Sequence, residues 1–220
     1  MSSALKSHYS ARDLRTLDRV FRLRLINSVS GYKSANLIGS VNEEGQSNLA
    51  IFNSVVHIGS NPPYLGFIMR PTTVPRHTLN NILNTGHYTI NHISEAITEQ
   101  AHYSSANFDK EVSEFKECGL TEWYDQSLYA PYVKESPIKL GMLFKEKVDV
   151  LSNGTSLIVG QVQEIYFDED FLTELGDVDL EKAKIVAVSG LNHYHQVRKL
   201  SSYPYARVND LPNFNREKQS

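Results

Sequence analysis

The stretch NLAIFNSVVHIGSNPPYLGFIMRPTTVPRHTLNNIL, residues 48–83, places two apolar, strand-like runs beside a cluster of small polar and basic side chains. Proline fixes φ and cannot continue a central strand, so Asn61-Pro62-Pro63 is predicted to form a turn between the two runs. In the second run, Tyr64 to Arg70, alternate residues are large and apolar. The alternation predicts a strand with one face in the core and Arg70 on the other face, where the strand ends.

A helix is predicted directly after this strand. Thr72-Thr73 offers an N-cap, Pro75 is tolerated in the first helical turn, and Gly86 is a typical C-terminal stop. The helical spacing is carried by Val74, Thr78, Ile82 and Leu83.

The rest of the chain is dominated by β-like segments. Before the stretch we expect a short surface helix over Ser10 to Asp18, then an extended segment that begins at Val20, Phe21, Leu23 and Leu25. A hairpin with its turn at Asn42 to Gly45 follows, its second arm running from Leu49 to Ile58. After the stretch we expect a strand from His87 to Ile93, a polar helix starting near Ser94, and β segments at Pro137 to Phe144, Lys147 to Leu151, Leu157 to Phe167 and Lys184 to Ser189, with a hairpin turn at Asn153-Gly154.

Six or more strands with only short helices predict a mainly β fold that closes into a barrel. No internal repeat or linker divides the sequence, so we expect a single domain over residues 1–220. Its N-terminal helical lead-in is interpreted as a lid or dimer element, and the aperiodic tail after Tyr203 as an irregular C-terminal arm.

Composition excludes several classes of function. The 220 residues carry a net charge of −3, so the overall balance favours neither nucleic acid nor an anionic membrane surface. Cys118 is the only cysteine, which rules out an intrachain disulfide and favours a reducing compartment. The charged N-terminus lacks a signal-peptide core and no window approaches a membrane span, so we expect a cytoplasmic protein.

The polar cluster is suited to a phosphate. Arg70, Arg76, Thr78 and Asn81 supply two cations, a hydroxyl and an amide at a strand end and in the helical turns that follow. Guanidinium groups and free N–H groups at a helix N-terminus are natural partners of a phosphate monoester. A solvated helix with chance surface arginines remains an alternative explanation of this pattern.

The preceding strand adds a second feature. Asn48, Asn53 and Ser54 flank apolar Leu49 to Phe52 where a neighbouring barrel strand should run beside Arg70. An aromatic ring system with polar edges would fit such a surface, although asparagines at strand ends are also common turn residues.

Together these segments resemble a known family. GQSNLAIFNSVVHIGSNPPYLGFIMR and RHTLNNILNTGHYTINHI are similar to the flavin reductase-like family of FMN-binding split barrels, which includes flavoredoxin. The family motif residues correspond here to Gly45, Asn48, Ala50, Ser54, Pro62-Pro63 and the helix Arg76 to Ile82, and ECGLTEWYDQSLYAPYVKESPIKL, beginning at Glu117, looks like a later family segment.

The resemblance implies a six-stranded antiparallel Greek-key split β-barrel that forms a homodimer and holds FMN near the subunit interface. The phosphate would lie by the helix and the ring along the strand from Asn48 to Ser54. The implied cofactor-binding residues are Asn48, Ala50, Ile51, Phe52, Asn53, Ser54, Arg70, Arg76, Thr78 and Asn81. Since the isoalloxazine carries the chemistry, no catalytic side chain is assigned.

The chain departs from the family pattern at two places. It has Gly31 to Asn36 where many members have a Pro-Arg-Pro stretch, and His77 where aspartate is usual. These differences leave the second substrate open.

Two other segments remain as candidates for the surroundings of the ring. His193 and His195 share one side of a predicted strand end, but no third ligand is evident, so we assign no metal site and expect His193 or Tyr194 to face the flavin or the partner subunit. The polar loop Tyr103 to Asn107 is either near the ring, as in family members, or a plain connection.

The sequence therefore predicts an FMN-dependent oxidoreductase that moves electrons from NAD(P)H to a flavin or another small-molecule acceptor. One alternative is an FMN-binding electron carrier or sensor that a partner protein reduces, without NAD(P)H turnover of its own. Another is a pyridoxamine-phosphate-oxidase-like or haem-binding relative of the same barrel. No Ser-His-Asp signature, P-loop or GxGxxG fingerprint supports a hydrolase, nucleotidase or Rossmann dehydrogenase.

Overall fold

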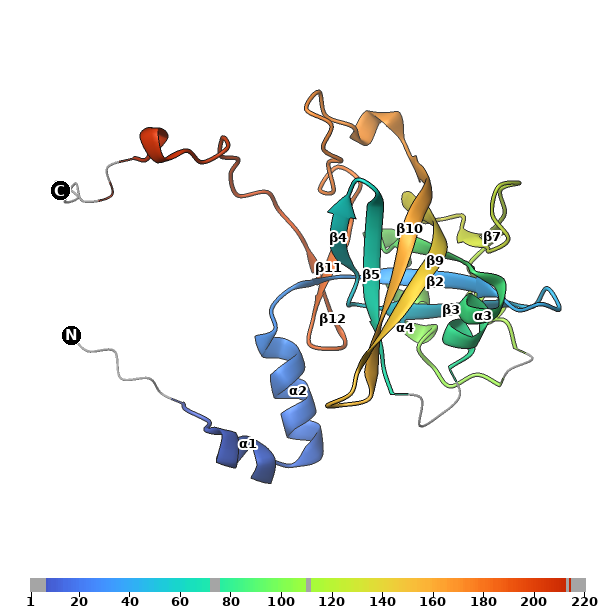
Figure 1. The fold of residues 1–220 in the computed structure, drawn as a ribbon, viewed down its shortest axis with the longest axis horizontal. Coiled ribbons are helices and arrows are strands. Elements are labelled where there is room, and N and C mark those ends of the chain that lie inside the picture. The colour runs from blue at the N-terminus through green and yellow to red at the C-terminus, as the bar shows by residue number, and fades with distance from the viewer. Residues whose placement is uncertain (1–6, 72–75, 110–111, 213, 215–220) are drawn as a thin grey trace.

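A curved antiparallel sheet forms the body of the molecule in a computed structural model, which describes residues 7–71, 76–109, 112–212 and 214 (Figure 1). The expected N-cap at Thr72-Thr73 and the proline of the first helical turn, Pro75, lie outside the described residues. The strand order in the sheet is β3 (Ser47–Phe52), β2 (Asn36–Val41), β6 (His87–His92), β9 (Ile138–Val150), β10 (Thr155–Phe167), β5 (Pro63–Met69) and β4 (Val56–Ser60).

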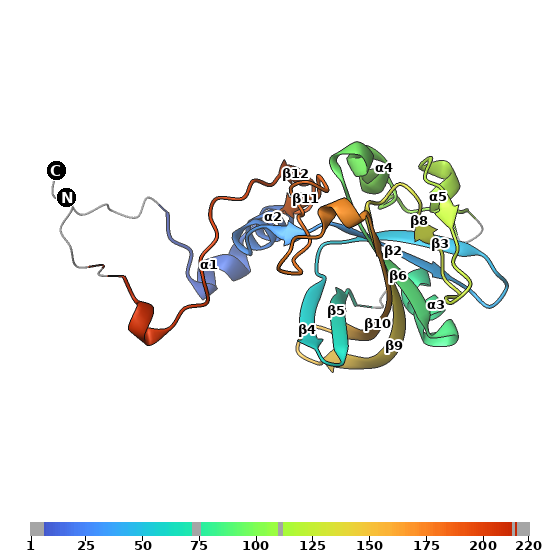
Figure 2. The same ribbon diagram turned by 90° about the horizontal axis from the view of Figure 1, so that it is seen from above.

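The mainly β prediction is confirmed, but the sheet differs in detail from the expected six-stranded closed barrel. It has seven strands, all paired antiparallel, and within the described part of the chain no pairing joins its edge strands β3 and β4. The curved sheet therefore stays open between β3 and β4 (Figure 2).

The hairpin turns follow the sequence signals closely. Gly45 and Gly154 adopt φ values of +82° and +73° at the tips of the β2–β3 and β9–β10 hairpins, a conformation that glycine adopts without strain. The Asn42 side-chain oxygen accepts hydrogen bonds from the backbone N–H groups of Glu44 and Gln46, which fixes the first turn. The two expected strands at residues 137–144 and 147–151 are one continuous strand, β9.

The segment Leu49 to Ile58 was expected to be one hairpin arm, and this prediction is wrong. The strand ends at Phe52, and the chain crosses to the opposite edge of the sheet to form β4. Ser54 fixes this crossing, because its hydroxyl accepts a 3.0 Å hydrogen bond from the N–H of Ile68 and lies 3.3 Å from the carbonyl oxygen of the same residue. A single apolar run therefore supplies both edges of the open barrel.

Two apolar clusters cover the two faces of this sheet. The barrel interior contains Phe67, Tyr88, Ile90, Met142 and Ile158. The opposite face of β2 and β3 packs against a second cluster that includes Leu37, Leu49, Ile93, Phe115 and Val188. This second layer places the small sheet of β1 (Lys33–Ser34), β11 (Val186–Ser189) and β12 (His193–Gln196) beside β3.

Short helices surround the sheet. α3 (His77–Thr85) packs on β2 and β3 and ends at Gly86 with φ +73°, as predicted. The expected polar helix near Ser94 is η1 (Glu95–Ile97) followed by α4 (Thr98–Tyr103). The remaining elements are α5 (Glu114–Glu117), β7 (Glu122–Trp123), β8 (Tyr132–Val133), η2 (Glu169–Phe171) and η3 (Val208–Asp210).

The N-terminal lead-in consists of two helices. α1 (Ala11–Thr16) agrees with the predicted surface helix, but the extended segment expected from Val20 is instead α2 (Arg19–Val29). The Asp18 side chain caps α2 by accepting hydrogen bonds from the N–H groups of Val20 and Phe21. None of the described helices is long and apolar enough to span a membrane.

Candidate functional site

A groove with a volume of about 610 Å³ lies along β3, in the size range of small-molecule sites, roughly 300–1,000 Å³. β3, the exit of β5 and the start of α3 form one wall. Nine of the ten predicted site residues line it: Asn48, Ala50, Ile51, Phe52, Asn53, Ser54, Arg70, Arg76 and Thr78. The tenth, Asn81, lies in a neighbouring cavity.

One end of the groove is cationic. Arg70 and Arg76 line it from either side of the connection between β5 and α3. Arg76 donates hydrogen bonds of 3.3 and 3.2 Å from Nε and Nη2 to the carbonyl oxygen of Pro71, which orients its guanidinium group. Among the described residues, neither arginine forms an ion pair with a carboxylate. Both positive charges are therefore free to bind an anion.

The N-terminus of α3 adds neutral donors at the same end. Arg76 occupies the N-cap position, and no side chain from the described residues caps the helix. The buried Thr78 hydroxyl accepts a 2.9 Å hydrogen bond from Nδ2 of Asn48, which leaves its own O–H to donate elsewhere. Two guanidinium groups, a hydroxyl and uncapped N–H groups fit a phosphate monoester.

The middle of the groove is the open edge of β3. The Leu49 N–H donates a 3.0 Å hydrogen bond to the Glu114 carboxylate instead of to a strand, so it points away from β2. Because N–H directions alternate along a strand, the N–H of Ile51 lies on the same open edge. This edge offers backbone donors and acceptors to a flat ring with polar edges, such as a flavin.

Glu114 itself is a site residue that the sequence did not reveal. Burial raises the pKa of its carboxyl group, while the Leu49 N–H and nearby His77 lower it. No local motif marks Glu114, because its role depends on α5 packing against β3.

Asn53 and Ser54 line the groove, yet their side chains also hold the structure. Nδ2 of Asn53 donates a 3.4 Å hydrogen bond to the carbonyl oxygen of Gly190, which links β3 to the loop after β11. The Ser54 hydroxyl is engaged by the backbone of Ile68. Their side chains therefore shape the groove, and their capacity to bind a ligand directly is reduced.

The opposite wall comes from segments distant in sequence. His102 and Tyr194 meet there, with Nδ1 and the hydroxyl oxygen 3.3 Å apart. Burial raises the pKa of Tyr194. Of His193 and Tyr194, Tyr194 lines the groove and His193 does not. The polar loop predicted at Tyr103 to Asn107 lines the groove through residues 104–108, without Tyr103. Further lining residues that sequence reasoning missed are Asn27, Val188, Leu191 and Asn192.

His195, which was considered with His193 as a metal ligand pair, is engaged differently. Its Nε2 lies 2.8 Å from the hydroxyl oxygen of Ser189. Within residues 7–71, 76–109, 112–212 and 214, no group of three or more histidine, cysteine, aspartate or glutamate side chains could hold a metal ion.

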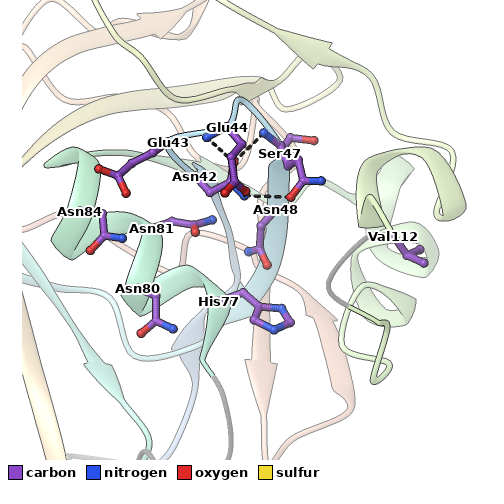
Figure 3. A pocket seen from close by; sticks show the side chains of 11 residues that line it. Asn42, Glu43, Glu44, Ser47, Asn48, His77, Asn80, Asn81, Asn84 and Val112 are labelled. Carbon is purple, nitrogen blue, oxygen red and sulfur yellow. Dashed lines mark hydrogen bonds between the residues drawn. The ribbon is translucent and has the colours of Figure 1, made fainter.

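A second cavity of about 210 Å³ adjoins the groove, between α3 and the β2–β3 hairpin (Figure 3). Asn48 and His77 line both spaces. Asn81 belongs to this cavity, where its Nδ2 donates a 3.2 Å hydrogen bond to the Ser40 hydroxyl. Asn81 was predicted to lie in the groove beside a phosphate, but it lines the second cavity instead.

Comparison with known proteins identifies the family. The family described as flavin reductase like domain matches residues 29–192, well over half of the chain. A candidate flavin reductase with a split barrel domain from Shewanella frigidimarina NCIMB 400 is 44% identical, with a TM-score of 0.88 over 91% of this chain and all of that one.

More distant proteins share the fold. Nitrilotriacetate monooxygenase component B from Bacillus cereus is 18% identical, with a TM-score of 0.80 over 92% of this chain and all of that one. Flavoredoxin of Desulfovibrio vulgaris (Miyazaki F) is 20% identical, with a TM-score of 0.70 over 94% of this chain and 98% of the other. The predicted split barrel is thereby confirmed. The chain belongs to the flavin reductase-like family.

Proposed function

We propose that this protein is an FMN-dependent oxidoreductase of the flavin reductase type, which takes electrons from NAD(P)H and passes them to a flavin or another small-molecule acceptor. Family membership supports a flavin-related oxidoreductase in general. The observation that carries the finer proposal is one groove that combines an open strand edge with a cationic end that has no carboxylate partner among the described residues.

The cationic end would hold the phosphate of FMN. Arg70 and Arg76 would neutralise its charge. Because the Thr78 hydroxyl oxygen accepts a hydrogen bond from Asn48, its O–H would be left to donate to a phosphate oxygen. The N–H groups at the start of α3 add donors with a favourable helix dipole. A charged phosphate thus fixes one end of the cofactor in the groove.

The edge of β3 would hold the ring system. Ala50, Ile51 and Phe52 would supply the backbone there, and the N–H of Ile51 would stabilise negative charge on a reduced ring. Glu114 keeps this edge in place through Leu49. Bound FMN would supply the electron-transfer chemistry.

The protein side of the mechanism is positioning and exclusion of water. His102 and Tyr194 add half-buried side chains to the lining of the groove, and the loop at 104–108 lines the same groove. We assign no side-chain acid or base, because bound FMN would supply the electron-transfer chemistry and the backbone N–H groups of β3 would stabilise negative charge there.

Two further properties belong to the proposal. We place the protein in the cytoplasm, where reducing conditions suit its single cysteine, Cys118. We also propose a homodimer, because α2 buries no residue in one copy and exposes several apolar side chains.

The decisive experiment is an absorbance spectrum of the purified protein, followed by mass identification of the chromophore that heat releases. Flavin bands with FMN in the supernatant support the cofactor. Protein that is colourless and fails to bind added FMN contradicts it, and a different chromophore, such as haem, would assign the barrel to another use.

Steady-state consumption of NADH and NADPH with free flavin then tests the reaction. Rapid turnover supports the reductase. Bound FMN without turnover would instead assign the protein as an electron carrier or sensor that a partner protein reduces.

A further inference from the structure

Glu114 places a carboxylate in a groove whose charged end is otherwise cationic. Among the described residues that line the groove, Glu114 is the only acidic one, whereas Arg70 and Arg76 line the same space. The proposed function uses its side chain only to accept the Leu49 N–H. A neutral amide oxygen would also accept that hydrogen bond, so the negative charge of Glu114 has no role in it.

A short chain of contacts places this carboxylate near the start of α3. Oε2 of Glu114 accepts the hydrogen bond from the N–H of Leu49 at 3.0 Å. The preceding residue, Asn48, donates from Nδ2 to the Thr78 hydroxyl at 2.9 Å. Thr78 is the second residue of α3, and both α3 and α5 pack on β3. The carboxylate and the first turn of α3 therefore lie at the same end of β3.

The electrostatic surroundings of Glu114 make its charge effective. The residue is half-buried, and solvent and salt screen such a charge less than an exposed one. Burial raises the pKa of its carboxyl group, while the N–H of Leu49 and nearby His77 lower it. The other charged or titratable residues that line the groove are Arg70, Arg76, His77, His102 and Tyr194. Glu114 is the only one of these groups whose charged form near neutral pH is negative.

A negative charge at this position acts on a phosphate but not on a neutral ring. The phosphate of FMN carries nearly two negative charges, so an ionised Glu114 opposes the attraction that Arg70 and Arg76 exert on it. Riboflavin has the same ring and ribityl chain without the phosphate, and this repulsion is absent for it. The hydrogen bond to Leu49 affects both ligands alike, because it shapes the edge of β3.

We propose that Glu114 is a specificity-determining residue of the flavin site, whose negative charge limits how much a phosphate adds to flavin affinity. The two arginines hold the phosphate, and Glu114 weakens that hold, so that FMN exchanges with free flavin. This inference rests on the proposed function, since it needs a flavin phosphate at the start of α3.

The test measures the dissociation constants of FMN and riboflavin for the full chain by quenching of flavin fluorescence. The titrations are made at about pH 8, well above the phosphate pKa of about 6. Glu114→Gln keeps an acceptor for the Leu49 N–H and removes the charge. It should tighten FMN binding about three- to tenfold, leave riboflavin affinity within about twofold, and lose part of this gain at high salt.

Two further variants separate charge from structure. Glu117→Gln removes the same charge from an exposed position of α5 outside the groove, so the ratio of the riboflavin constant to the FMN constant should stay at the wild-type value. Glu114→Ala removes the charge and also leaves the Leu49 N–H without its acceptor. It should weaken the binding of both flavins and still raise that ratio.

The remaining outcomes overturn the inference in distinguishable ways. An unchanged ratio in both Glu114 variants would show that the charge does not act on the phosphate. Weaker FMN binding in Glu114→Gln at unchanged riboflavin affinity would show that the carboxylate favours the phosphate-bound state. In both cases FMN still binds and the proposed function stands, whereas wild-type protein that binds neither flavin would overturn the proposed function as well.

Discussion

Arg70 and Arg76 both line the cationic end of the groove, but their surroundings differ. Arg76 is tied to the Pro71 carbonyl oxygen, whereas the exposed Arg70 makes no side-chain hydrogen bond to any described residue. Arg70 can therefore move onto a ligand, while Arg76 offers a fixed charge. The sequence predicted both residues, because a basic residue at a strand exit next to a helix start is visible in the pattern.

Arg70→Ala should weaken FMN binding by about 1–3 kcal/mol, the range of a charge-assisted hydrogen bond. The measurement is a titration of apo-protein with FMN, with Lys145→Ala on β9 as a control that removes a charge outside the groove. Unchanged affinity in Arg70→Ala would remove this residue from the site.

His92 is a half-buried titratable residue that no part of the proposed function uses. Its Nδ1 has no hydrogen-bond partner in the described structure, and neither has Oδ1 of Asn36, its cross-strand neighbour. Burial lowers the pKa of His92 to about 4. The sequence could not reveal this, because the burial arises only when β2 and β6 pair.

The pKa of His92 implies that stability depends on pH. A lowered pKa means that the unfolded chain binds more protons than the folded chain between about pH 6.5 and 4. His92 should therefore contribute full stability above pH 6.5, and up to about 3 kcal/mol should be lost as the pH falls to 4. Urea unfolding at pH 7 and 4.5 measures this, and His92→Asn should show a smaller difference between the two. An equal pH dependence in both proteins would contradict the assignment.

At the level of elements, the sequence patterns predicted the structure correctly where local chemistry decides the backbone conformation. The turns at Gly45 and Gly154 and the stop of α3 at Gly86 need a positive φ, which glycine marks directly. α2 was missed because Arg22 and Arg24 alternate with Leu23 and Leu25, which imitates the period of a strand. In addition, α2 buries no residue in one copy, so its sequence has no buried apolar stripe that would show the period of a helix.

The break between β3 and β4 was missed for a different reason. The run Leu49 to Ile58 is mostly apolar, and Asn53-Ser54 is the only polar pair that separates its two strand parts. The hydrogen bonds of Ser54 to Ile68 depend on β5 lying next to the crossing. Such a tertiary contact leaves no trace in local spacing.

The packing of β10 against β6 depends on Gly160. A Cβ at this position would collide with the hydroxyl of Tyr88 and would lie 2.8 Å from its Cζ. Tyr88 is fully buried in the barrel interior, so its ring has no free space to enter. Glycine is therefore required here for space.

Gly160→Ala should destabilise the protein by about 1–3 kcal/mol, the usual cost of overpacking a core. Thermal unfolding measures the change. Gly59→Ala on edge strand β4 is the matched control, because its nearest atom lies at 3.7 Å and its φ is not positive. Equal melting temperatures for Gly160→Ala and the wild type would show that the ring of Tyr88 can move.

On the scale of the whole molecule, the candidate groove joins segments from residue 27 to residue 194. The wall from β3 to α3 was predictable because its residues are close in sequence. The opposite wall, with His102, Glu114 and Tyr194, is brought there by the second apolar cluster, which packs α4, α5 and β12 around β3. Its position follows from long-range packing, which one sequence does not display.

The two ends of the chain bear on the proposed homodimer. α2 and the C-terminal arm after Tyr203 both extend from the same side of the barrel in two views (Figures 1 and 2). Both expose apolar side chains: Val20, Phe21, Leu23, Ile26 and Val29 on α2, and Tyr203, Tyr205, Val208, Leu211 and Phe214 on the arm. An isolated helix of 11 residues is marginal in water, since helices shorter than roughly 12–15 residues need packing. A second copy of the chain would provide that packing.

Phe21→Glu combined with Ile26→Glu should therefore convert a wild-type dimer into a monomer, or weaken the dimer more than about tenfold, because two charges would enter an apolar interface. Sedimentation velocity across micromolar concentrations measures the change, with Leu175→Glu, a fully exposed loop position, as the control. If FMN is held near the interface, the same variant should also lose FMN affinity, although neither residue lines the groove of one copy. A wild-type monomer, or a variant that stays dimeric, would show that α2 is not the contact. A monomeric variant with full FMN affinity would show that each copy completes its own site.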